Sequence, residues 1–267
     1  MPSDDPILLS RDGPVATLTL NRPESLNTLN AAMMEALVAH TAALAADVSV
    51  RCVVVKGAGR HFMAGGDLRT FAAALPYPPA ERKTSFTNLI LHLHAAIENF
   101  QRMPAPVVAS VHGAVAGFGL SLMCACDLAI AADNAYFTSA YRHIALTPDG
   151  GLSHTLPRIV GVRKAMEIVL LGERFDAQEA LRLGLVNRIV PAADLDAATA
   201  AIVQALVAGP ATAIANGKRL VNQSLARTLS EQLQAEAESF GRCAATEDFV
   251  EGINAFLAKR PVQFGGD

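Results

Sequence analysis

The sequence predicts an α/β fold built from parallel βαβ-type units and completed by a helical C-terminal region. Apolar, β-rich runs alternate with segments of helical spacing up to about residue 158, which is the pattern of a parallel sheet covered by helices. Beyond that residue the strand signal fades and helical patterns dominate. We therefore expect a core domain over residues 1–196 and a helical region over residues 197–267.

Composition narrows the class of protein further. The 267 residues are 51% apolar and 18% charged, which argues against a disordered or fibrous chain. A formal net charge of -3 gives no support for a nucleic-acid partner. The polar, acidic start does not resemble a secretory signal or a transit peptide, and no uninterrupted apolar run is long enough to span a membrane. The four cysteines lack the spacing of a zinc knuckle, so we expect reduced thiols, no metal and a cytoplasmic location.

The elements of the first half follow from local patterns. Residues 15–20 are apolar and β-rich, and the Asn-Arg-Pro sequence of residues 21–23 stops this strand. Asn30 is placed to cap a helix that runs to about residue 46. Residues 50–56 form a nearly continuous apolar run, as expected of a strand buried on both faces. A long helix is expected over residues 81–101.

The remaining elements are predicted in the same way. Residues 107–111 read as a strand, residues 117–123 open a short helix, and residues 127–131 form another strand. The helices expected in the last third of the chain cover residues 177–183, 194–207, 211–226, 230–240 and 247–258.

Three glycine-rich turns each lead into a predicted helix. In the turn of residues 62–67, glycines would let the backbone approach a ligand, although Asp67 could equally act as a helix cap. The turn of residues 112–121 has neither the spacing of a dinucleotide-binding fingerprint nor the Gly-Lys-Ser/Thr of a phosphate-binding loop. In the turn of residues 145–151, Asp149 stands between a proline and two glycines, where a cap is again the alternative.

Taken together, the order and spacing of these turns resemble the crotonase superfamily, also called the enoyl-CoA hydratase/isomerase family. The resemblance covers nearly the whole chain. The matching segments are residues 20–27, 64–67, 105–113, 117–119, 126–127, 156–161, 180–186 and 251–260. It implies a ClpP-like spiral of ββα units, an acyl-CoA thioester site in the core domain, and a C-terminal region that mediates trimers, often paired into hexamers.

The resemblance also implies an oxyanion hole, in which two main-chain N–H groups hold the thioester oxygen while it carries enolate charge. By the matching motifs, these donors belong to Ala64 and Phe118. Gly65, Gly117 and Gly119 flank them and would let the thioester come close. Fixed N–H dipoles at a point of developing charge need little reorganisation during the reaction.

The reaction is indicated by three further positions. Ser121 and Tyr141 stand where hydratases of the family carry two glutamates, so the usual hydratase apparatus is missing and both side chains are expected in the acyl pocket. Asp149 resembles the lone acid of the single-acid enoyl-CoA isomerases and of the ring-forming isomerases of phenylacetate breakdown. We expect Asp149 to shuttle a proton from C2 to C4 of a 3-enoyl-CoA. The alternatives are a hydratase using Asp149 alone, or a non-catalytic CoA-ester-binding or RNA-associated scaffold.

Contacts with CoA, which is part of the substrate and not a separate cofactor, follow from the same resemblance. They are expected at Ser25, Leu26, Ala64, Asp67 and Leu68, with Phe256 and Lys259 reaching the CoA of a neighbouring subunit. Lys259 could instead be a solvated lysine at a helix end. His92 and His94 point to different faces of the predicted helix and are not expected to share a metal, and His112 and His143 are expected to be structural.

Overall fold

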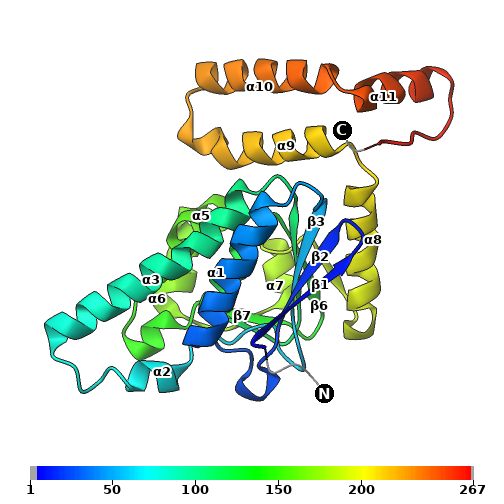
Figure 1. Ribbon diagram of the computed structural model, residues 1–267. Coiled ribbons are helices and arrows are strands. Elements are labelled where there is room, and N and C mark those ends of the chain that lie inside the picture. Colours follow the sequence, from blue (N-terminus) through cyan, green and yellow to red (C-terminus); the bar gives the residue numbers. More distant parts are fainter. Residues whose placement is uncertain (1–4, 266–267) are drawn as a thin grey trace.

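The computed structural model describes residues 5–265 and has a six-stranded main sheet (Figure 1). The sheet order is β1-β2-β3-β4-β6-β9, in which β1 runs antiparallel to β2 and all other neighbours are parallel. These strands cover Ile7–Asp12, Val15–Leu20, Cys52–Gly57, Val107–Val111, Leu128–Ala132 and Arg188–Val190. The expected parallel core is therefore confirmed, with one antiparallel edge strand added.

A second, smaller sheet has the order β5-β7-β8, with strands Ala114–Ala116, Tyr136–Thr138 and Phe175–Asp176. The pairs β4–β5 and β6–β7 each send one strand to the main sheet and the next to the small sheet before helical structure follows. This is the repeated ββα unit. Gly113 makes the turn between β4 and β5 at φ +57, where a Cβ would stand 2.3 Å from the Arg60 carbonyl oxygen.

Helices cover both faces of the main sheet. On one face α1 (Ala31–Ala46) packs against α3 (Pro79–Arg102), and α4 (Phe118–Ala125) is completely buried. The Asn30 side chain caps α1 by accepting from the Met33 N–H, as predicted. The other α-helices are α2 Leu68–Ala72, α5 Leu152–Val160, α6 Val162–Leu171, α7 Ala177–Arg182, α8 Leu195–Val207, α9 Ala211–Gln223, α10 Leu229–Ala244 and α11 Glu247–Leu257. Short 3-10 turns cover Pro23–Ser25, Tyr141–Ile144, Ala192–Asp194 and Ser224–Ala226.

Strand β3 is buried on both faces, as its continuous apolar sequence predicted. Val53 and Val55 belong to the core beneath α1 and α3. Val54 belongs to a second cluster on the opposite face, where it is joined by Leu195 and Val203 of α8. The boundary predicted between residues 196 and 197 therefore falls inside α8, and α8 is part of the core.

Helices α9, α10 and α11 stand apart from the sheet and form a C-terminal arm (Figure 1). The prediction of a largely helical last third is confirmed, but it missed the short strands β8 and β9. Within residues 5–265 no single helix is long and apolar enough to cross a membrane; the stretches 192–207 and 211–226 reach that length and apolar composition only when taken together, across a bend of 106°.

A buried ion pair fastens the C-terminal arm to the core. The Lys218 Nζ of α9 lies 2.8 Å from the Asp127 carboxylate, and the two side chains are only 6% and 16% exposed. The same ammonium donates to the carbonyl oxygens of Phe100 and Ala105 at 2.8 and 3.0 Å. All three ammonium protons therefore have acceptors, which is what makes a buried lysine tolerable.

Replacing Lys218 by methionine should lower the free energy of unfolding by about 3–5 kcal/mol, because Asp127 would remain buried without its cation. Urea unfolding followed by circular dichroism measures this loss. The double variant Lys218→Met/Asp127→Asn should recover much of it, since no uncompensated charge is left. A single variant as stable as the parent protein would contradict this account.

Candidate active site

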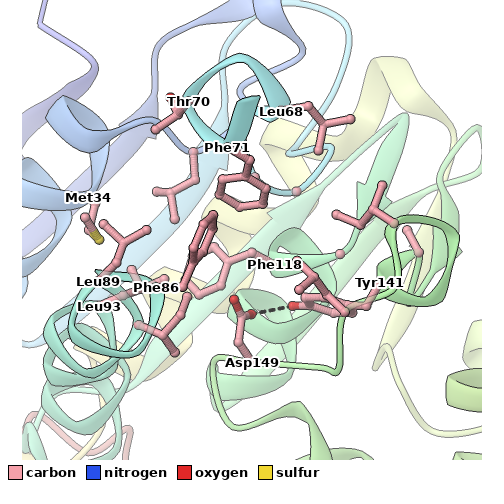
Figure 2. Close-up of a pocket in the computed structure, with 18 of the residues that line it drawn as sticks. Met34, Leu68, Thr70, Phe71, Phe86, Leu89, Leu93, Phe118, Tyr141 and Asp149 are labelled. Carbon is pink, nitrogen blue, oxygen red and sulfur yellow. Dashed lines mark hydrogen bonds between the residues drawn. The ribbon is translucent and has the colours of Figure 1, made fainter. Parts of the chain in front are cut away.

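A largely apolar cavity of about 420 Å³ lies between α2, α3, the start of α4 and the loop that precedes α5 (Figure 2). Its wall on the α2–α3 side includes Phe71 and Phe86, whose rings meet edge to face with centroids 5.2 Å apart. Met34, Leu89 and Leu93 continue this wall. A cavity of this size and character suits the apolar part of a small-molecule ligand.

The first two glycine turns meet at the cavity. Gly65 has φ +95 and Gly117 has φ +52, and a Cβ on Gly117 would lie 3.2 Å from the Gly65 Cα. A Cβ on Gly65 would lie 3.8 Å from the Phe118 nitrogen. Gly119 lets α4 pack directly on the backbone of the first glycine turn, since its Cβ would stand 2.4 Å from the Met63 carbonyl oxygen. The three predicted glycines are therefore brought together. Close backbone approach favours glycine at positions 117 and 119, and the positive φ favours it at position 65.

Of the two predicted N–H donors, one is free and one is not. The Phe118 N–H is the first of α4, and among residues 5–265 it has no acceptor, as expected for a helix start. The Ala64 N–H instead donates to the Leu26 carbonyl oxygen at 3.1 Å. The prediction that Ala64 supplies a free donor is therefore wrong, although Ala64 does line the cavity.

The neighbouring Gly66 has the geometry that was expected of Ala64. Leu29 pairs with this segment by donating to the Gly65 carbonyl and accepting from the Asp67 N–H, at 2.8 and 2.9 Å. In a parallel bridge of this kind, the residue between the two partners directs its own N–H and C=O away from the opposing strand. Gly66 lines the cavity, and its N–H has no acceptor within the described part of the chain.

The third turn places the Asp149 carboxyl in the cavity (Figure 2). The cap residue of α5 is Gly151, which makes no side-chain cap, so Asp149 is not the helix cap that was the alternative. Asp149 Oδ1 accepts from the Tyr141 hydroxyl at 2.5 Å. Tyr141 lines the cavity as predicted, whereas Ser121 is fully buried behind it and hydrogen-bonds the Tyr141 hydroxyl at 2.8 Å. Ser121 therefore lies outside the acyl pocket in which it was expected.

The surroundings of Asp149 raise the pKa of its carboxyl. Burial raises the pKa of this carboxyl above its usual range, and the hydrogen bond from Tyr141 and the proximity of His94 oppose the rise without cancelling it. A raised pKa at a carboxyl in a cavity is typical of a proton-transfer site.

His94 is a site residue that sequence reasoning missed. It lines the cavity from α3, and its Nε2 accepts from the Gly150 N–H at 3.2 Å. His92, two residues earlier, faces away and pairs with Glu35 on an exposed surface. The signal that could have separated the two histidines is helical spacing, because His94 follows Ile90 by four residues on the cavity-facing side.

The residues predicted to contact CoA fall into two groups. Leu68 lines the cavity mouth, and Asp67 both caps α2 and pairs with Arg22 at 2.9 Å. Burial acts against ionisation of Asp67, but the hydrogen bonds from Arg22 and the Arg69 N–H outweigh it and lower its pKa. Ser25 and Leu26 lie in the turn that is bonded to this segment. Phe256 belongs to α11 and Lys259 follows it, so both lie in the C-terminal arm and neither lines the cavity of its own chain.

Comparisons with known proteins agree with this architecture. The sequence model described as "Enoyl-CoA hydratase/isomerase" matches residues 10–267. A "probable enoyl-CoA hydratase" of Rhodobacter capsulatus is 40% identical over 94% of this chain and 95% of its own. The 1,2-epoxyphenylacetyl-CoA isomerase of Escherichia coli is 33% identical, again over 94% and 95% of the two chains. The crystal structure of an enoyl-CoA hydratase from Polaromonas sp. JS666 superposes with a TM-score of 0.90, at 36% identity, over 97% of this chain and 99% of that one.

The spiral of ββα units and the paired glycine turns therefore define a crotonase fold. The chain belongs to the enoyl-CoA hydratase/isomerase family, and it is an enzyme of that family. The similar proteins carry both hydratase and isomerase names, so the reaction has to be argued from the side chains around the cavity.

Proposed function

We propose that this enzyme isomerises a 3-enoyl-CoA to the conjugated 2-enoyl-CoA, with Asp149 as its one acid/base group. The observation that carries the proposal is the set of polar groups at the cavity. Among the described residues that line it, Asp149 is the only carboxylate. Hydroxyl side chains, which do not serve as bases at neutral pH, occupy positions 121 and 141. One carboxylate is sufficient for a proton shuttle, whereas addition of water requires that a water molecule also be held and activated.

The reaction proceeds in two proton transfers. The Asp149 carboxylate takes a proton from C2, and the electron pair of the C–H bond moves into the thioester to form a dienolate. The N–H groups of Gly66 and Phe118 donate to the oxygen that gains the charge, and each such donor is typically worth about 3 kcal/mol. Asp149 then returns the proton at C4, which restores the carboxylate and leaves the double bond conjugated with the thioester.

The acyl chain and the CoA occupy different parts of the site. The apolar wall of Phe71, Phe86 and Leu93 suits the acyl chain. The CoA part of the bound substrate extends out of the cavity past Leu68 and along the turn that contains Ser25 and Leu26. The aromatic wall and the similarity to 1,2-epoxyphenylacetyl-CoA isomerase also make aryl-containing acyl groups suitable substrates.

A panel of thioesters tests the proposal. With a 3-enoyl-CoA, the ultraviolet absorbance of the conjugated thioester should appear, and with crotonyl-CoA it should persist. Loss of absorbance from crotonyl-CoA would identify a hydratase instead. Binding without turnover of any member of the panel would identify a CoA-ester-binding scaffold.

The C-terminal arm is proposed to mediate self-association into a trimer or a pair of trimers. Its surface carries large apolar side chains that are at least two-thirds exposed in the single chain, namely Val221, Leu225, Leu229, Phe240, Phe256 and Leu257. A cluster of exposed apolar residues of this extent is typical of a subunit interface. Packing of the arm on another subunit would also bring Phe256 and Lys259 to a neighbouring CoA.

Replacing Phe240 by aspartate should shift the protein towards monomers, because a buried charge would be placed in the proposed interface. Size-exclusion chromatography with light scattering measures the mass of the assembly. Val48→Asp is a suitable control, because Val48 is 95% exposed and lies in the turn after α1, away from the arm. An unchanged mass for the Phe240 variant would rule out this part of the arm as the interface.

A further inference from the structure

Three side chains from three elements form a hydrogen-bonded line that ends at the acid. Ser121 comes from α4, Tyr141 from the 3-10 turn Tyr141–Ile144, and Asp149 from the loop before α5. The exposure of Ser121 is 0%, so Ser121 lies behind the cavity, which both Tyr141 and Asp149 line. Gly150 allows this approach, since a Cβ there would stand 2.8 Å from the Phe118 ring and 2.9 Å from the Ser121 Cβ.

The direction of each hydrogen bond in this line is fixed by chemistry. An ionised carboxylate can only accept, so the Tyr141 hydroxyl donates its one proton to Asp149 Oδ1. The Tyr141 oxygen must then accept from Ser121, whose Oγ is 2.8 Å away. The other acceptor within reach of Ser121, the Gly117 carbonyl oxygen, is 3.5 Å away. The proton order is therefore Ser121 to Tyr141 to Asp149.

We propose that Tyr141, supported by Ser121, is a positioning residue that occupies Oδ1 of Asp149 and leaves Oδ2 to carry the substrate proton. This inference rests on the proposed function of Asp149. When Oδ2 takes the proton, Oδ1 becomes a carbonyl oxygen and still accepts from Tyr141. The line of hydrogen bonds thus survives both protonation states without rearrangement. It also holds the carboxyl in one orientation between its two proton transfers.

The hydroxyl of Tyr141 is suited to this task because it does not compete for the proton. Burial, followed by the charge of Asp149, raises the pKa of Tyr141 well above its usual range, so the phenol remains a donor. The titratable groups at the cavity besides Asp149 are Tyr141, His94 and His143. The His143 ring is held at the Gly172 carbonyl, and His94 Nε2 is held by the Gly150 N–H. Tyr141 is therefore the group that bonds the carboxyl directly.

The hydrogen bond from Tyr141 to Asp149 determines the direction in which the pH dependence of activity should shift when Tyr141 is replaced. The base must be ionised, so activity falls as the pH drops through the pKa of Asp149. The Tyr141 hydrogen bond lowers that pKa against the effect of burial. Tyr141→Phe should therefore move the acidic limb of the profile of kcat/KM against pH upwards, by about one to two pH units for a bond to a charged group. The KM for the 3-enoyl-CoA should stay nearly unchanged.

Two further variants keep this inference testable if Tyr141→Phe folds poorly. Ser121→Ala should move the same limb in the same direction by a smaller amount, because it weakens the line at its far end. Site-specific 3-fluorotyrosine at position 141 is a stronger donor of nearly the same shape, so it should move the limb downwards. Tyr136→Phe is the matched control, since it removes a phenol that lies beneath Arg174 and outside the cavity.

The outcomes separate this inference from the proposed function. A folded Tyr141→Phe variant with an unmoved limb would overturn the positioning role, provided that Asp149→Asn is inactive. An active Asp149→Asn variant would overturn the proposed function and the inference with it. An acidic limb of the kcat/KM profile that moves in Tyr141→Phe and not in Tyr136→Phe supports both the positioning role of Tyr141 and the proposed function.

Discussion

Replacing Asp149 by asparagine should lower kcat for 3-enoyl-CoA isomerisation by about a thousandfold, in the middle of the range that a general acid/base typically contributes. Asparagine keeps the shape of the side chain and can still accept from Tyr141, but it cannot take the C2 proton. The measurement is the rate at which the absorbance of the conjugated thioester appears under saturating substrate.

A binding measurement and a control variant distinguish loss of the proton acceptor from other effects of Asp149→Asn. The variant should bind a saturated acyl-CoA, which cannot react, with the affinity of the parent protein, because the N–H groups of Gly66 and Phe118 are untouched. Asp196→Asn provides the control for the chemical change alone, since the Asp196 side chain is 85% exposed and pairs with Lys56 outside the cavity. Full activity of Asp149→Asn would remove this carboxyl from the mechanism.

Replacing Gly65 by alanine should lower kcat/KM by about a hundredfold to a thousandfold, the loss typical of one disabled oxyanion donor. The new methyl group would stand 3.8 Å from the Phe118 nitrogen, beside this proposed donor, and 3.4 Å from the Ala116 carbonyl oxygen. Steady-state kinetics with a 3-enoyl-CoA measure the loss.

A variant at a second glycine distinguishes the effect of backbone strain from the effect of crowding at the Phe118 N–H. Gly161 also has a positive φ, +77, but a Cβ there would meet nothing within 4 Å. Gly161→Ala should therefore lower the melting temperature through strain while it leaves kcat/KM nearly intact. If the two variants lost activity equally, crowding at the Phe118 N–H could not be the cause.

Sequence patterns located β2, β3, β4 and β6 of the main sheet and missed the other strands of the described chain. The apolar runs of β3 and β4 are recognisable in the sequence, because residues 52–55 and all of β4 are buried between hydrophobic layers. In β1 only Ile7 is buried, so no alternation signals the strand. Strands β8 and β9 have two and three residues, which is too short for any period, and they form because tertiary contacts hold them.

For the site, the sequence located Asp149, Tyr141 and the glycine cluster, but not His94 or the directions of the polar groups. The glycine cluster and the placement of Asp149 in the cavity follow the prediction. The choice between Ala64 and Gly66 depends on which N–H points at Leu29 and its neighbours, and this is set by pairing with a segment more than thirty residues away in the chain. The bond between Tyr141 and Asp149 likewise depends on how a 3-10 turn folds against the next loop.

The use of main-chain nitrogens at the thioester has a consequence for protein engineering. An amide N–H remains at positions 66 and 118 whichever residue other than proline is encoded, so polarisation of the carbonyl does not depend on side-chain identity there as long as the turns close. Diversity for directed evolution can therefore be confined to positions 121, 141 and 149, with the glycines held constant. The members of such a library that fold would retain substrate activation and differ in how they protonate the dienolate.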